Sequence, residues 1–244
     1  TFNETLDINT NAGASAFNIT DGGVEINADV NGRDITVTNG SSLTVIGNTT
    51  LTNTLTITDG TVQSDGDLSI ANDLIVASGD IIANGSVTLT DDLTLGAGTT
   101  FSFLDQEVTL NGSLTNNGGT FISNSSSTLN ILGTGVFGTI AFDPGSELGA
   151  FVLNRPTGGT LVTLNSPVTI TGIFDLLNGG FLNTSGLDFA SGAIVTRNSA
   201  ASFIATSTVP TGGPYDLIYE GTSFTTGGEF QGSINDSVSN STGT

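Results

Sequence analysis

The chain contains no cysteine, histidine, methionine, tryptophan or lysine among its 244 residues. Disulfides, thiolate nucleophiles and zinc–thiolate sites are therefore excluded, and no imidazole can act as a base or a metal ligand. The only cations are Arg33, Arg155 and Arg197, against 23 carboxylates and a formal net charge of −20. Because binding to a phosphate backbone needs clustered cations, we expect no nucleic-acid partner.

Long apolar runs are also missing, so the sequence predicts no transmembrane segment. Features of a signal peptide are absent, and the chain starts at Thr1 rather than at methionine. We interpret it as a mature or excised segment of a secreted precursor and predict an extracellular, cell-surface location. An apolar content of 36% with only 11% charged residues favours a folded chain over a disordered one.

An internal repeat dominates what is present. Turns that contain glycine are followed by a large apolar residue at intervals of 19 to 22 residues, and this series comprises Val24, Leu43, Val62, Ile81, Phe101, Phe121, Ile140, Leu161, Phe181 and Phe203. A second series begins with Val30, Leu51, Leu68, Val87 and Val108. A third begins with Ile35, Leu55, Leu74, Leu93 and Leu114. Three series of apolar residues that share a period of about 20 residues indicate a repeat architecture.

Within each repeat, apolar and polar residues alternate, as in Val87-Thr88-Leu89. This alternation is typical of half-buried strands, and Asn-Gly and Asp-Gly pairs between them suit tight corners. The sequence therefore predicts an all-β fold, a right-handed parallel β-helix (β-solenoid) of about ten coils of about 20 residues with three short strands per coil. The phenylalanines of the first series are expected to point inward.

The pattern predicts three parts of the chain. Residues 1–204 form the solenoid, residues 205–230 a C-terminal cap or irregular final coil, and residues 231–244 a polar tail or linker. The end of a solenoid exposes unpaired backbone. Apolar anchors near the C-terminal end are candidates for an assembly interface, namely Tyr215, Leu217, Tyr219 and Phe224.

Coils such as residues 66–101 (GDLSIANDLIVASGDIIANGSVTLTDDLTLGAGTTF) resemble the repeats of secreted bacterial β-helix surface proteins, among them adhesins and autotransporter passengers. Residues 215–228 are similar to the closing coils of such regions. The resemblance implies a surface protein. Similar repeats also occur in viral tail fibres, so assignment to a viral fibre stays open as an alternative.

Carboxylates supply the one candidate metal site. Asp73 and Asp92 are 19 residues apart, each directly before an apolar residue of the third series, so they are expected to stack on adjacent coils beside Asp91. Exposed like charges about 5 Å apart repel by just under ~1 kcal/mol in water. A calcium ion would relieve this repulsion and needs only oxygen ligands. A solvated acidic face that confers solubility is the alternative.

We find no catalytic constellation and predict that the protein is not an enzyme. The three arginines lie on separate coils and are interpreted as surface or corner charges. Asn130 and Asp188 interrupt the outward threonines and serines that an ice-binding face would need in every coil.

We therefore predict a non-enzymatic, rod-like subunit of a surface fibre, filament or adhesin, with calcium as the only candidate cofactor. Its expected partners are further copies of itself, joined head to tail through the coil ends, or other surface proteins and glycans. A carbohydrate-binding or carbohydrate-cleaving β-helix, like a viral tail fibre or a polysaccharide lyase, is the alternative, followed by an ice-binding solenoid.

Overall fold

The computed structural model describes residues 6–8, 16–156, 161–199, 202–206, 210–220 and 234–240. In this part of the chain every regular element is a β-strand. The strands wind into a parallel β-solenoid of about ten turns of roughly 20 residues, as the repeat predicts. The chain divides into two compact units, Thr1–Ile122 and Ser123–Thr244.

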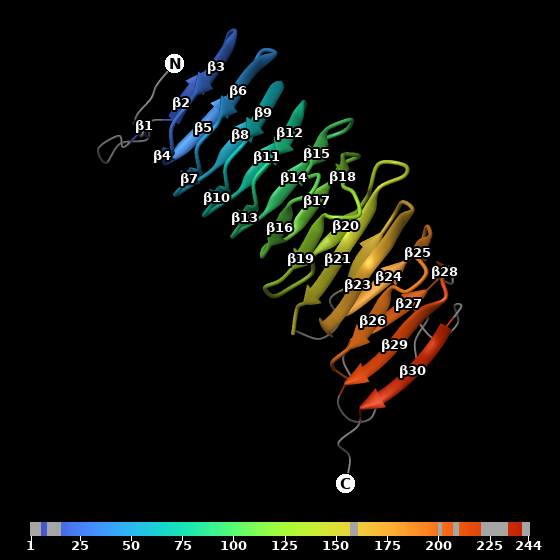
Figure 1. The fold of residues 1–244 in the computed structure, drawn as a ribbon. Helices are drawn as coiled ribbons and strands as arrows, with labels where there is room; N and C mark the ends of the chain where they lie inside the picture. Colours follow the sequence, from blue (N-terminus) through green and yellow to red (C-terminus); the bar gives the residue numbers. More distant parts are fainter. Residues whose placement is uncertain are drawn as a thin grey trace. The chain divides into compact units, whose positions relative to one another are not determined.

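Three parallel sheets make up the first unit, because each coil contributes one strand to each sheet (Figure 1). The first sheet contains β1 (Leu6–Ile8), β4 (Val30–Gly32), β7 (Thr49–Leu51), β10 (Leu68–Ile70), β13 (Val87–Leu89) and β16 (Glu107–Leu110). The second contains β2 (Ala16–Ile19), β5 (Asp34–Val37), β8 (Leu55–Ile57), β11 (Leu74–Val76), β14 (Leu93–Leu95) and β17 (Leu114–Asn116). The third contains β3 (Gly23–Ile26), β6 (Ser41–Val45), β9 (Gly60–Ser64), β12 (Asp80–Ala83), β15 (Thr100–Ser102) and β18 (Thr120–Ile122).

Two of the expected inward columns are confirmed in this unit. The third sheet pairs the apolar residues of the first series from Val24 to Phe121 coil by coil. The second sheet does the same from Ile35 to Leu114. Phe101 and Phe121 are fully buried, with ring centroids 5.5 Å apart, so these aromatic side chains fill the core as expected.

One position of the remaining column was predicted wrongly. Val30 pairs with Thr49, not with Leu51, and Thr49 pairs with Leu68. Leu51 lies in the neighbouring inward column, between Gly32 and Ile70. Residues two apart in a strand face the same side, so the apolar pattern alone did not distinguish these two positions.

Tight corners join the strands, and close approach of successive coils selects glycine there. A Cβ atom on Gly66 would lie 2.5 Å from the backbone oxygen of Gly47 in the preceding coil. Gly85 repeats the arrangement on Gly66. These glycines allow the corners to stack at the same spacing as the strands.

The second unit departs from three short strands per coil. One sheet of the described residues contains β19 (Thr128–Ile131), β21 (Glu147–Asn154), β23 (Val168–Asn178), β25 (Leu187–Phe189), β26 (Ile194–Arg197), β28 (Thr211–Gly212), β29 (Tyr215–Glu220) and β30 (Ile234–Asn240). The other contains β20 (Gly138–Ile140), β22 (Leu161–Leu164), β24 (Gly180–Asn183) and β27 (Phe203–Thr206). The strand pairs of the described part of this unit are parallel, and β23 pairs with both β25 and β26. Two expected short strands have therefore merged into one of 11 residues.

The expected continuation of the first series is wrong in this unit. Ile140 pairs with Leu164, and Phe181 pairs with Val162 and Ile204 rather than with Leu161 and Phe203. Longer and less regular connections shift the register by one to three residues, which the spacing of apolar residues did not reveal. The aromatic core continues nonetheless, because Phe151 stacks on Phe174 with centroids 5.0 Å apart.

Candidate functional site

The acidic triad of Asp73, Asp91 and Asp92 lies at the corners that precede β11 and β14. The pairing of Leu74 with Leu93 places Asp73 and Asp92 on adjacent coils, as their spacing predicts. Each of the three residues offers a carboxylate oxygen, and these oxygens all lie within 4.8 Å of one another. Oxygen atoms in this arrangement have the chemistry that calcium prefers, although calcium takes six to eight ligands.

Hydrogen bonds within the corner already use part of these carboxylates. Asp73 Oδ1 accepts the backbone N–H of Asp92 at 3.2 Å. Asp92 Oδ1 accepts the backbone N–H of Ser113 at 2.7 Å and its hydroxyl at 2.8 Å. Asp73 and Asp92 therefore each connect their coil to the next one. This role explains these two acids without an ion, and calcium binding by the triad stays a prediction.

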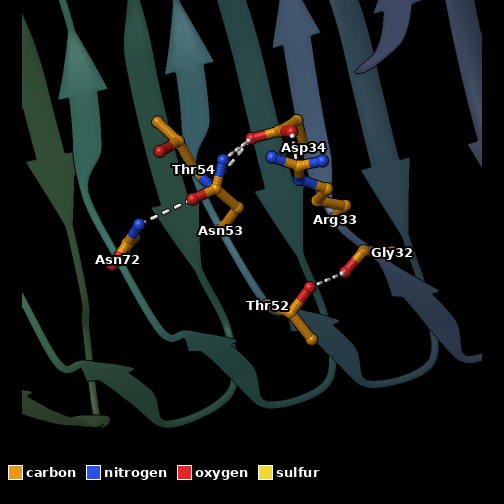
Figure 2. Close-up of polar contacts among 7 residues, drawn as sticks. All are labelled: Gly32, Arg33, Asp34, Thr52, Asn53, Thr54 and Asn72. Carbon is orange, nitrogen blue, oxygen red and sulfur yellow. Dashed lines mark hydrogen bonds and ion pairs between the residues drawn. The ribbon is translucent and has the colours of Figure 1, made fainter. Parts of the chain in front are cut away.

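A ladder of polar side chains runs along the same corner in the preceding coils (Figure 2). Asp34 Oδ1 accepts hydrogen bonds from Asn53 Nδ2 at 2.5 Å and from the backbone N–H of Thr54 at 3.2 Å. Asn53 in turn accepts from Asn72 Nδ2 at 2.6 Å. Asp91 occupies the next position at the same 19-residue interval. Sequence reasoning missed this ladder, although the constant interval of Asp34, Asn53 and Asn72 was the available signal.

The corners on the other side of the first sheet carry a second ladder of side chains that bond to the following coil. Asp29, Asn48 and Asp67 accept backbone N–H groups of the following coil at 2.8, 2.9 and 3.0 Å. In both corners the acceptor belongs to the earlier coil and the donor to the later one. The corner acids thus act as links between coils that also keep the surface negatively charged.

The interpretation of the arginines as surface charges is correct for Arg33 and wrong for the other two. Arg33 is exposed, and its Nε lies 3.4 Å from Asp34 Oδ2. Arg155 is only 1% exposed and donates to the backbone oxygens of Leu132, Thr134 and, at 2.9 Å, Gly135.

Arg197 is completely buried, donates to the Ser202 oxygen, and lies over the ring of Tyr219 at 5.4 Å. Backbone carbonyls and an aromatic face replace water around these guanidinium groups, a favourable setting for a buried cation. Neither group is therefore presented to a substrate at the surface.

The candidate assembly residues lie mostly inside the second unit. Tyr215 and Leu217 are fully buried and Tyr219 is 7% exposed. The Tyr215 ring packs on Phe189 with centroids 4.6 Å apart, and β29 is paired with both β26 and β30. Phe224 lies outside the described residues. These side chains stabilise the last coils, and the prediction that they form an assembly interface remains a prediction.

The geometry defines a class of protein: a parallel β-solenoid repeat protein with a filled core and hydrogen-bonded polar corners. No protein-family model, curated protein or solved structure matches the chain. In the part that the structure describes, no helix has the length and the apolarity needed to cross a membrane.

Proposed function

We propose that this chain is a non-enzymatic extracellular structural protein, a subunit of a surface fibre or adhesin in which stacked coils serve as a stiff spacer. The observation that supports this proposal best is the coil-to-coil register. Strands of successive coils pair in parallel throughout each unit, and their inward residues are almost completely buried. A stack held by continuous ladders and a packed core resists bending and extension because its contacts are repeated in each coil.

The distribution of reactive groups also supports a structural role. The sequence has no histidine or cysteine, two of its three cations are buried on backbone carbonyls, and its corner acids bond to the next coil. A lyase-like mechanism would need an exposed cation beside several acids. The exposed cation, Arg33, pairs with Asp34, two coils before the acidic triad that begins with Asp73. The extracellular location and the assignment to fibres or adhesins follow from the resemblance of the repeats.

Immunogold electron microscopy of intact producing cells tests this proposal. Antibodies raised against the purified chain should label fibres or the outer surface without permeabilisation. Label that appears only inside permeabilised cells would contradict it. Release of reducing or unsaturated ends from acidic polysaccharides, with calcium present, would instead favour the carbohydrate-cleaving alternative.

A further inference from the structure

An exposed turn in the second unit joins Asp143 to the proline that follows it. The Asp143 carbonyl oxygen accepts the backbone N–H of Ser146 at 3.1 Å, and Gly145 has a φ of 87°. A turn with proline at its second position and a positive φ at its third is of type II. Asp143, Pro144 and Gly145 are exposed, and a Cβ atom on Gly145 would meet no atom within 4 Å. Water therefore reaches this turn.

Residues on both sides of the turn are anchored in the fold. Phe142 is 3% exposed, and its backbone N–H donates to Ser166 Oγ. Ser146 is 6% exposed and directly precedes β21. The bond between Asp143 and Pro144 is therefore held at the surface between two buried residues.

The Asp143 carboxylate lacks the structural task of the other corner acids. Asp29, Asp67 and Asp92 accept backbone N–H groups of the following coil. Among the described residues, no hydrogen bond or ion pair holds the side chain of Asp143. This carboxyl group is free to turn toward the backbone carbonyl carbon of its own residue, and their joining closes a five-membered ring, a size that favours intramolecular attack.

We propose that the peptide bond between Asp143 and Pro144 is a site of self-cleavage. A carboxyl oxygen of Asp143 attacks the carbonyl carbon of the same residue, and the C–N bond to Pro144 breaks. The carboxyl proton moves to the proline nitrogen, which leaves as a secondary amine. Water then opens the cyclic anhydride, which restores the side-chain carboxyl group and leaves a new C-terminal carboxyl group on Asp143.

Two features of the turn favour this step. The N–H of Ser146 already donates to the carbonyl oxygen of Asp143, where negative charge develops during the attack. The leaving nitrogen belongs to a tertiary amide and must gain a proton as the bond breaks, so acid speeds the reaction.

Cleavage would leave residues 1–143 and 144–244 joined only by strand pairing and packing. β19 lies before the cut and β21 after it, and these strands pair in parallel over four residues of β19. β20 and β22 pair across the same cut. The second unit therefore holds the two pieces together and gains an amino group at Pro144, in a chain whose only other side-chain cations are three arginines.

The test incubates the full chain at the lowest pH at which circular dichroism still shows it folded. Mass spectrometry under denaturing conditions should then detect residues 1–143 and 144–244 as separate fragments, whereas gel filtration at the same pH should show one species. The folded chain should be cleaved at least as fast as the chain unfolded in urea at that pH, because only the folded turn places the Ser146 N–H on the carbonyl oxygen.

Two variants separate the carboxyl group from the leaving group. Asp143→Ser keeps a residue that suits the first turn position but removes the carboxyl group, and Pro144→Ala keeps the carboxyl group but replaces the leaving nitrogen. Each should slow cleavage by about tenfold or more without a change in circular dichroism. An intact folded chain under conditions that cut the unfolded chain, equal cleavage of Asp143→Ser, or fragments that separate on gel filtration would overturn this inference.

Discussion

At the scale of single residues, the most informative side chains are those that break the apolar pattern of the core. Arg155 lies inside the second unit, where it donates to three backbone oxygens of the segment from Leu132 to Gly135 and lies 5.6 Å from the centroid of the Phe137 ring. The sequence offered no signal for this burial, because a lone arginine before Pro156 also suits a surface corner. The acceptors come from a loop about 20 residues away, which only the fold brings within reach.

Replacing Arg155 with methionine should destabilise the protein by about 3 kcal/mol, because buried carbonyls lose charged donors while the volume of the side chain is kept. Chemical denaturation followed by circular dichroism measures this change in the free energy of unfolding. Arg33→Met is the matched control and should change it by less than about 0.5 kcal/mol, because Arg33 is exposed. Equal effects of the two substitutions would contradict the role assigned to Arg155.

Thr49 illustrates the opposite case, a polar residue in an apolar column. It is 4% exposed, lies between Val30 and Leu68, and its hydroxyl oxygen is buried with no hydrogen-bond partner. Thr49→Val keeps the shape and removes the unsatisfied hydroxyl, so it should stabilise the protein by about 1–2 kcal/mol. Thr50→Val, on the exposed face of the same strand, should be nearly neutral. A destabilising Thr49→Val would show that the hydroxyl has a partner in solution.

At the scale of elements, strands and corners follow different rules. Strand positions in the first unit were predictable, because a period near 20 residues brings equivalent apolar residues together coil after coil. Corner chemistry was predictable only in part: the stacking of Asp73 and Asp92 followed from their spacing, but their bonds to the next coil did not. Those bonds depend on the direction in which each corner presents its backbone N–H.

The acidic triad gives a test at this scale. If calcium binds Asp73, Asp91 and Asp92, millimolar calcium should raise the thermal midpoint beyond the effect of matched ionic strength from sodium chloride. Asp91→Asn should abolish the extra increase. If the triad is only a solvated acidic face, calcium and sodium chloride should act alike at equal ionic strength. Asp91→Asn should then stabilise the corner by a few tenths of a kcal/mol, roughly, through relief of repulsion.

Two other carboxylates should make opposite contributions to the pH dependence of stability. Burial raises the pKa of Asp175, the nearby charge of Glu220 adds to this shift, and a hydrogen bond from Asn198 opposes it. Hydrogen bonds from Asn84 and Gln63 lower the pKa of Asp65. The stabilisation that Asp175 contributes to the folded state is therefore fully present below the pKa of this residue in the unfolded chain, and it is lost as pH rises through the folded pKa. The stabilisation that Asp65 contributes is present above its unfolded pKa and is lost as pH falls through its folded pKa.

Asp175→Asn should accordingly gain stability relative to the unmodified chain as pH rises from about 3 to about 7, whereas Asp65→Asn should lose it. Urea denaturation at several pH values measures both trends. The sign of each trend is the decisive result. A flat difference across this range for Asp175→Asn would show that its carboxyl titrates alike in the folded and unfolded states.

At the scale of the whole molecule, the repeat makes the coils interchangeable in principle. Deletion of residues 68–86 removes one coil of 19 residues from the first unit and joins Asp67 to Val87, which takes the register of Leu68. The shortened chain should fold with the same circular dichroism and lose the stability of about one coil, because solenoid contacts are additive between neighbours.

Deletion of residues 68–77, about half a coil, is the control for this experiment. It should abolish the cooperative unfolding transition, because it removes β10 and β11 but keeps β12, so the coil can no longer supply one strand to each of the three sheets. Thermal and urea unfolding of both variants provide the comparison. If the full-coil deletion were as damaging as the half-coil deletion, stability would not be distributed over the coils.

By itself the sequence determined that this chain winds into a parallel stack, where its corners lie and that the apolar series of the first unit face inward, although it missed the inward Thr49. A constant period leaves few other ways to bury three apolar series in one phase. Only the tertiary structure decided the register of the second unit, the merging of two strands into β23, the burial of Arg155 and Arg197, and the hydrogen bonds of the corner acids. These features depend on loop lengths and on the backbone groups that a neighbouring coil presents, and neither is encoded in the spacing of apolar residues.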